Sequence, residues 1–300
     1  MTPGPLFLMA FLENAPARGP SPARLERAVR LLYPAGREAM LGPWRLFTDV
    51  AAGPLLERLG RVAARLPESY RARFGLDAEP RAGEALVLFA GDASYRAFAA
   101  DAAEFETLAT RGHAGGGLAA AVAGTTPEET RPIVVHELGH LLTHEAFAHP
   151  PPPWIDEGLS EDLAWCRADA EGRLLFGTFD AVTTARPMGD GVVRTTVGPR
   201  PTVDAFLERA RTGRRPALSA LLAPDTRLFS DAGTRRDAYT AAGLLVRFLL
   251  AGDLARAERF RVFLRAATLG APAGLDDLAA AVGTDAKRLE KEYWSFVRSP

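Results

Sequence analysis

One five-residue stretch constrains this chain more than any other: His136, Glu137, Leu138, Gly139 and His140 follow one another. On a helix, residues four positions apart project from the same face, so the two imidazoles can bind one metal ion. Glu137 follows the first histidine, which places its carboxylate beside such an ion, where it can take a proton from metal-bound water. The alternative is a helix on which two unrelated histidines fall at this spacing by chance.

The residues before this stretch have the signals of a helix start. Thr126 can act as the N-cap, Pro127 suits the first helical position, and the first turn that follows is acidic. Pro132 fits poorly inside a helix, so a start at Thr130 or Arg131 is the alternative. Either start predicts one helix that carries both histidines.

A second stretch, residues 150–162, begins with a proline-rich loop and continues as a predicted helix. A zinc site with two histidines needs a third protein ligand and an open position for water. Two antiparallel helices would bring Glu157 opposite the imidazoles, and Glu161, one turn further, can accept a ring N–H, with His136 as the expected donor. Taken singly, Glu157 also fits a carboxylate favoured at a helix start, and Glu161 a solvated helix face.

The two motifs together resemble those of the gluzincin metallopeptidases, the clan of thermolysin and aminopeptidase N. They are most similar to the bacterial peptidase-MA-like domains. The resemblance implies zinc bound by His136, His140 and Glu157, with Glu137 as the general base. The motifs are His136-Glu137-x-x-His140 and Trp154-x-x-Glu157-Gly158.

The resemblance extends from about Leu46 to the C-terminus, but only the two helices carry specific motifs. Ser160 stands where those domains usually have alanine. The chain also lacks the G-x-M-E-N-type stretch of the aminopeptidases. A specificity for free amino termini is therefore not expected.

Composition narrows the class of protein. With 47% hydrophobic and 24% charged residues, 300 residues are expected to form one large domain or two small ones. A net charge of −1 gives no electrostatic basis for binding nucleic acid or an anionic membrane. Cys166 is the only cysteine, which excludes an intramolecular disulfide, and we expect it to be a small core residue on the second helix rather than a nucleophile.

Residues 1–22 are expected to be a flexible or signal-like N-terminus. The apolar run 6–12 is too short to cross a bilayer and lacks a preceding basic region, so no stable membrane insertion is predicted. The run is compatible with the remnant of an export signal, with a first strand or with a disordered start. Localisation therefore stays open between the bacterial cytoplasm and export.

Hydrophobic patterning predicts an α+β fold of two lobes in one catalytic unit. Residues 23–170 are expected to form a mixed αβ lobe with a small sheet that contains the metal-binding helices. Residues 171–300 are expected to form a mainly helical lobe, after short β-like pieces that can make a hairpin over the cleft. The expected strands are 44–50, 85–90, 173–179 and 192–197, and the expected helices are 22–32, 53–70, 94–101, 202–211, 216–222, 235–251, 254–267, 274–282 and 284–297.

Small residues fill the segment from Gly115 to Gly124, just before the metal-binding helix. In extended form they leave backbone groups open to an added peptide strand, and the family resemblance places a substrate-binding edge strand here. The alternative is a glycine loop followed by an ordinary core strand.

A zinc peptidase also needs a donor for the oxyanion that forms on the attacked carbonyl. In the aminopeptidase-like branch a tyrosine on a downstream helix supplies it, and Tyr239 is our candidate, with a core tyrosine as the alternative. Weaker candidates are His144, Arg235, Arg236 and Arg247. His144 is expected to support the site or to lie in the core rather than to bind the ion, and His113 and His149 are expected to lie in loops.

The sequence thus predicts a zinc-dependent metallopeptidase that acts on a peptide or protein substrate. Two alternatives remain. One is a non-catalytic binding or scaffold protein with a gluzincin fold, against which the intact Glu137 argues. The other is a zinc hydrolase of a non-peptide substrate.

Overall fold

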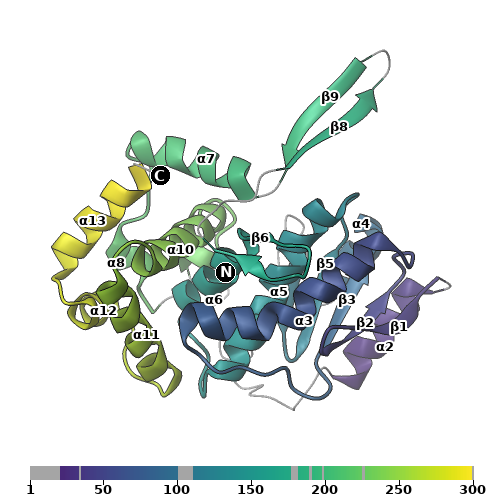
Figure 1. The fold of residues 1–300 in the computed structure, drawn as a ribbon, viewed down its shortest axis with the longest axis horizontal. Coiled ribbons are helices and arrows are strands. Elements are labelled where there is room, and N and C mark those ends of the chain that lie inside the picture. The colour runs from purple at the N-terminus through teal and green to yellow at the C-terminus, as the bar shows by residue number, and fades with distance from the viewer. Residues whose placement is uncertain are drawn as a thin grey trace, which may run out of the picture.

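A five-stranded sheet lies in the N-terminal half of the chain, in a computed structural model that describes residues 21–33, 35–100, 111–176, 182–188, 191–197, 199–224 and 227–298 (Figure 1). β2, β3 and β5 are parallel, whereas β1 and β4 run antiparallel to their neighbours at the two edges. All residues of β3 and β5 are buried, as expected of central strands covered on both faces. The strand order is β1 (Arg37–Leu41), β2 (Trp44–Thr48), β3 (Ala85–Phe89), β5 (Leu118–Val122) and β4 (Gly112–Gly115).

Helices cover both faces of this sheet. Successive residues of a strand point to opposite sides, so each central strand packs against helices on both faces. Leu86 and Leu88 of β3 pack in one apolar cluster with side chains of α3 and α5. Val87 and Phe89 pack in a second cluster with α2 and α4. The four helices are α2 (Pro22–Leu32), α3 (Pro54–Phe74), α4 (Asp92–Ala100) and α5 (Pro127–Ala146).

The rest of the described chain is mainly helical. Two short ladders interrupt it, β6 (Arg167–Ala168) with β7 (Leu174–Leu175), and β8 (Val182–Met188) with β9 (Gly191–Val197). The β8–β9 hairpin projects away from the other elements in Figure 1. The helices are α6 (Pro153–Ala164), α7 (Pro199–Arg211), α8 (Leu218–Leu221), α9 (Arg227–Ser230), α10 (Arg235–Leu250), α11 (Leu254–Thr268), α12 (Leu275–Val282) and α13 (Ala286–Arg298).

A buried cluster of charges joins three of these helices. Asp162 of α6 is fully buried; its Oδ2 lies 2.8 Å from Arg73 Nε of α3, and its Oδ1 lies 2.9 Å from Arg247 Nε of α10. Burial alone would raise the pKa of Asp162, but the two guanidinium groups outweigh it and lower this pKa. The cluster ties the sheet-covering helix α3 to the C-terminal half.

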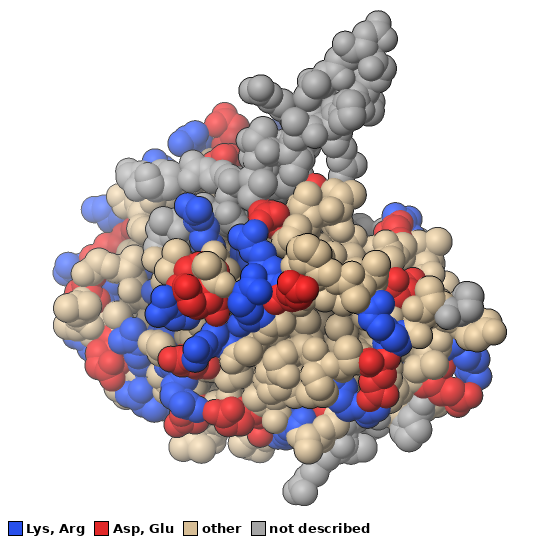
Figure 2. All heavy atoms as spheres, turned by 45° about the vertical axis from the view of Figure 1, so that its right-hand side comes forward, with Lys and Arg blue, Asp and Glu red and all other residues tan. Residues whose placement is uncertain are grey.

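The predicted α+β class, a small sheet with many helices, is confirmed. Several boundaries were wrong: α4 begins at Asp92 rather than after a cap at Ser94, and β1 and β8 were not predicted. Residues 1–20 of the expected N-terminal segment, and Asp101, lie outside the described residues. Among the described residues, no helix is both long and apolar enough to cross a membrane. On the face shown in Figure 2, basic and acidic side chains are interspersed, as the net charge of −1 suggests.

The segment expected as one edge strand is divided by a turn. Gly116 and Gly117 have φ values of 58° and 73°, the left-handed conformation that a two-residue hairpin turn requires. The turn places Leu118–Val122 in the interior of the sheet as β5, and the edge falls to Gly112–Gly115. The expectation of an edge strand was therefore wrong for most of Gly115 to Gly124, and the stated alternative, a glycine loop followed by a core strand, is what the structure has. A run of small residues does not distinguish an edge strand from a central one.

Candidate metal centre

The helix that carries the two histidines starts at the residue the cap signals indicate. The Thr126 side chain accepts a hydrogen bond from Glu129 N at 3.2 Å, and α5 begins at Pro127. The Glu129 carboxylate accepts bonds from both the backbone N and the hydroxyl of Thr125, each at 2.7 Å. These bonds satisfy donors that a helix start otherwise leaves open. Pro132 is accommodated inside the helix, so the start does not slip toward it.

Glycines let the neighbouring helices approach closely enough to form the site. A Cβ on Gly139 of α5 would lie 3.1 Å from Ser160 Oγ of α6, which is tight contact. On the other side of α6, a Cβ on Gly158 would lie 2.9 Å from Val246 Cγ2 of α10. Gly158 follows Glu157 directly, so the glycine sets the distance between α10 and the turn of α6 that bears this carboxylate.

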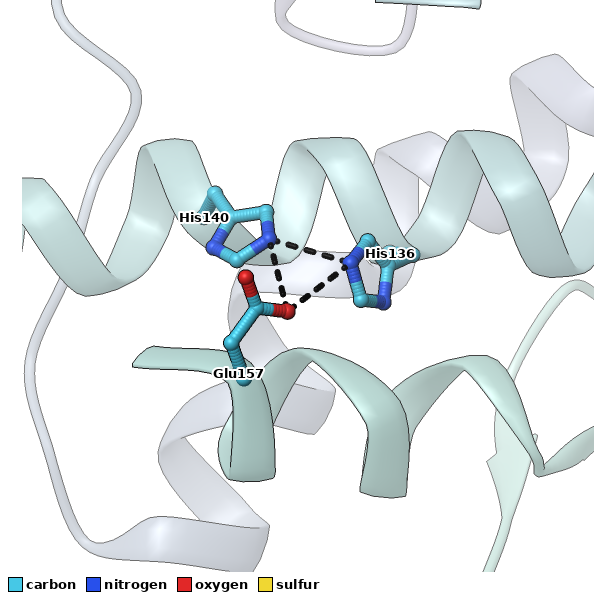
Figure 3. Close-up of side chains that lie close together, drawn as sticks. All are labelled: His136, His140 and Glu157. Atoms are coloured by element: carbon cyan, nitrogen blue, oxygen red, sulfur yellow. Dashed lines mark hydrogen bonds and ion pairs between the residues drawn. The ribbon is translucent and has the colours of Figure 1, made fainter. Parts of the chain in front are cut away.

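Three ligand-type atoms converge between α5 and α6 (Figure 3). His136 Nε2 and His140 Nε2 are 3.0 Å apart, and Glu157 Oε2 lies 3.4 Å from the first and 3.6 Å from the second. Ligands about 2.1 Å from one tetrahedral ion lie roughly 3.4 Å from each other. The structure thus brings together the three residues predicted as metal ligands, at the spacing that one small ion requires.

Asp156, which sequence reasoning missed, fixes the orientation of His140. Asp156 Oδ1 lies 2.7 Å from His140 Nδ1, and Oδ2 lies 2.9 Å from His144 Nε2. If Nδ1–H of His140 donates to Asp156, the lone pair of His140 Nε2 stays free and points toward the other two ligand-type atoms, on His136 and Glu157. The sequence shows an acid directly before Glu157, but whether its carboxylate points toward His140 depends on how α5 and α6 pack.

Glu161, predicted to accept the ring N–H of His136, faces the expected residue at a longer distance. Glu161 Oε1 lies 3.8 Å from His136 Nδ1, which is within ion-pair range but too far for a hydrogen bond. The expected pairing of residues is found, and the expected hydrogen bond is not.

The acidic surroundings keep both imidazoles basic. Burial alone would lower the pKa of His140, but the charges of Asp156 and Glu157 outweigh it and raise this pKa to about 10. Burial alone would also lower the pKa of His136, but the nearby carboxylates of Glu157 and Glu161 outweigh it and raise this pKa. Positive charge is therefore stabilised at the point where the two Nε2 atoms meet.

The predicted general base, Glu137, is buried on the side of α5 that faces the sheet edge. It is 5% exposed, and its carboxylate lies against Gly112 of β4, where a Cβ would overlap it. Burial raises the pKa of Glu137 to about 7, against the lowering effect of His136 and His140. A divalent cation beside it would favour the charged form and lower this pKa.

No family model, curated protein or solved structure matches this chain. The resemblance to gluzincins therefore rests on the two sequence motifs alone and stays a prediction.

Tyr239, the candidate oxyanion donor, lies beside the metal centre on α10. Its ring stacks on that of His136 with centroids 6.4 Å apart and on that of Phe229 at 6.0 Å. Burial and then the negative charge of Glu157 raise the pKa of its hydroxyl well above the usual value, so the phenol is a neutral donor. Its ring also packs on the apolar core. The position of Tyr239 is therefore compatible both with the predicted oxyanion donor and with the alternative of a core tyrosine.

The remaining candidate residues differ in how far they lie from the three predicted ligands. His144 Nε2 lies 2.9 Å from Asp156 Oδ2, next to the predicted ligands. His113 lies on β4 and not in a loop, with its Nδ1 3.3 Å from the Tyr95 hydroxyl. Arg247 bonds Asp162 away from the metal centre. Cys166 is buried two positions beyond the end of α6 rather than on it, and burial raises the pKa of its thiol to about 12, which agrees with a core role.

Proposed function

We propose that this protein is a zinc-dependent metallopeptidase. The convergence of His136 Nε2, His140 Nε2 and Glu157 Oε2 on one point, with the buried Glu137 carboxylate next to them, carries the proposal. Two imidazoles and one carboxylate, with a fourth position left open, are the ligand set of catalytic zinc sites. An acid in the Glu137 position serves no purpose in a purely structural site.

The residues fit a bound cation. Glu157 Oε2 is buried and has no hydrogen-bond partner among the described residues. Two ring nitrogens 3.0 Å apart repel each other unless a proton or a cation lies between their lone pairs. The side chains of His136, His140 and Glu157 keep 15%, 9% and 14% exposure, so the centre is shielded but reachable from solvent.

In this proposal, the predicted ligands, Glu137 and Tyr239 each have a different role in hydrolysis. His136, His140 and Glu157 would hold the zinc ion, which would supply Lewis acidity toward a water molecule and a carbonyl oxygen. Glu137 accepts the proton of the attacking water and delivers it to the leaving amine, which needs a carboxylate shielded from bulk solvent. Tyr239 donates its hydroxyl hydrogen to the oxyanion that develops on the attacked carbonyl.

The edge strand favours a peptide as the substrate. Arg111 O accepts from Val122 N, so the alternation of an antiparallel ladder directs the backbone groups of Gly112 and Ala114 to the outer edge. Among the described residues no strand pairs with that edge. An extended peptide added there would pass beside Glu137, which contacts Gly112.

Metal analysis and a peptide-cleavage assay test the proposal. Purified protein should contain about one zinc per chain and cleave members of a quenched-fluorescence peptide library, and chelation should abolish cleavage. Glu137→Gln should retain zinc and lose cleavage, whereas His140→Ala should lose both. Bound zinc without turnover on a broad library would support a scaffold role instead, and His140→Ala protein with full zinc content would refute the ligand assignment.

A further inference from the structure

The metal centre continues, beyond its ligands, into a chain of three side chains from two helices. His140 and His144 lie one turn apart on α5, and Asp156 of α6 stands between them. Its Oδ1 lies 2.7 Å from His140 Nδ1, and its Oδ2 lies 2.9 Å from His144 Nε2. The side chain of Asp156 is 19% exposed and that of His144 is 31% exposed, so the chain runs from the buried ligand toward solvent.

Both oxygens of Asp156 are engaged, and this distinguishes the arrangement from a single bond between a ligand and its support. A carboxylate bonded through one oxygen can still rotate about its Cβ–Cγ bond, because that torsion is soft. A carboxylate bonded through both oxygens, to two side chains of one rigid helix, cannot. The orientation of the His140 ring therefore depends on His144, although His144 does not reach the convergence point.

We propose that His144 is a positioning residue, which acts through Asp156 to hold His140 in the orientation and tautomer that the metal centre needs. The proposal rests on the metal site of the proposed function and adds a requirement outside its ligand set. His144 Nε2–H donates to Asp156 Oδ2, and His140 Nδ1–H donates to Asp156 Oδ1, so Nε2 of His140 stays free to bind the ion.

His140, His144 and Asp156 also form a second group of possible metal ligands. A second metal site and a positioning role for His144 differ in the number of zinc ions that each chain would bind. A second ion among His140, His144 and Asp156 would require His140 to bind through both ring nitrogens at once, and hence to lose its Nδ1 proton. A positioning chain keeps that proton and needs one ion per chain.

Zinc affinity of the metal-free full-length chain, measured by competition with a chromophoric chelator, tests the proposal. His144→Leu should bind one zinc about 10-fold more weakly than wild type, and Asp156→Ala roughly 10- to 100-fold more weakly. His144→Gln, whose amide can donate from nearly the position of Nε2, should recover most of the affinity. His149→Leu, a matched change at an exposed histidine, should have no effect.

A double-mutant cycle separates positioning from a general effect on folding. If His144 acts through Asp156, His144→Leu should cost no further affinity in an Asp156→Ala background. The absorption spectrum of bound Co²⁺ should change in His144→Leu and return in His144→Gln. Equal, additive losses in the two backgrounds would overturn the proposal, as would two zinc ions bound per wild-type chain.

The two proposals fail in different ways. Wild-type protein that binds no zinc refutes the metallopeptidase and the positioning role together. Wild-type protein that binds and cleaves, with His144→Leu binding zinc equally tightly, refutes only the positioning role. Should His144→Leu fail to fold, as judged by circular dichroism, the comparison of His144→Gln with Asp156→Ala still decides, because loss of affinity in both variants would contradict the rescue.

Discussion

The carboxylate of Glu137 lies directly against the Cα of Gly112, with no room between them for a side chain. Glu137 belongs to α5, which carries two of the predicted ligands, and Gly112 belongs to the edge strand β4. In the proposed peptidase, their contact would set the distance from the general base to a peptide on that edge. Gly112→Ala should therefore displace Glu137 and reduce kcat about 10- to 100-fold, while zinc content stays at one per chain. Steady-state kinetics with metal analysis would measure this.

Gly91→Ala is the matched control for this change, because a Cβ there meets no atom within 4 Å. It should retain wild-type kcat. Full activity in Gly112→Ala would show that the position of Glu137 against the strand is not critical.

Tyr239 should affect turnover more than binding. Tyr239→Phe keeps the ring that stacks on His136 and Phe229 but removes the hydroxyl. Loss of one oxyanion donor is expected to lower kcat about 100-fold, with KM and zinc affinity nearly unchanged. A variant with normal kcat and a lower melting temperature would instead indicate a core tyrosine.

Asp162 should matter for stability and not for the chemistry. Asp162→Asn leaves the Arg73 and Arg247 guanidinium groups without their anion, and breaking such a buried pair costs about 3 to 5 kcal/mol. Urea unfolding monitored by circular dichroism would measure the loss. Glu26→Ala, which breaks an ion pair with Arg30 that is 68% exposed on both sides, should leave the midpoint nearly unchanged.

His113 should make the fold sensitive to acid. Burial lowers the pKa of His113 to about 3, whereas an unfolded histidine titrates near 6.5. Between these values the unfolded chain binds the extra proton, so the free energy of unfolding falls as the pH falls through this window, by about 1.4 kcal/mol per unit from this group. The contribution is fully present above about pH 6.5.

The comparison of wild type with His113→Gln isolates this effect from other titrating groups. Between pH 7 and pH 5, the variant should lose about 2 kcal/mol less unfolding free energy than wild type. Parallel pH profiles for the two proteins would contradict a buried neutral imidazole.

The proximity of the three predicted ligands could be predicted from the sequence because their arrangement is local. His136 and His140 share one helical face by spacing alone, and Glu157 follows on the next helix. The bounds of α2 and α10 followed from apolar spacing in the same way, to within a residue.

The residues that were missed act between elements, where spacing carries no information. Asp156 reaches His140 only because α5 and α6 pack face to face, and Gly112 meets Glu137 only because β4 lies at the sheet edge. The sequence left open whether Gly116 and Gly117 belong to an edge strand or to a loop, and their positive φ values place them in a turn. Strand β1 was missed because charged residues, the half-buried Arg37 and the exposed Glu38, occupy its first two positions.

All three predicted ligands come from two helices that are consecutive in the chain, whereas Gly112 and Tyr239 come from elements before and after them. In the proposed metallopeptidase, metal binding and turnover would therefore have separate structural requirements. A descendant of this protein in which the edge strand or α10 drifted would keep its ion while its chemistry decayed. Related chains that retain the two helical motifs are thus expected to include silent members, and the residues at positions 112 and 239 would tell them apart.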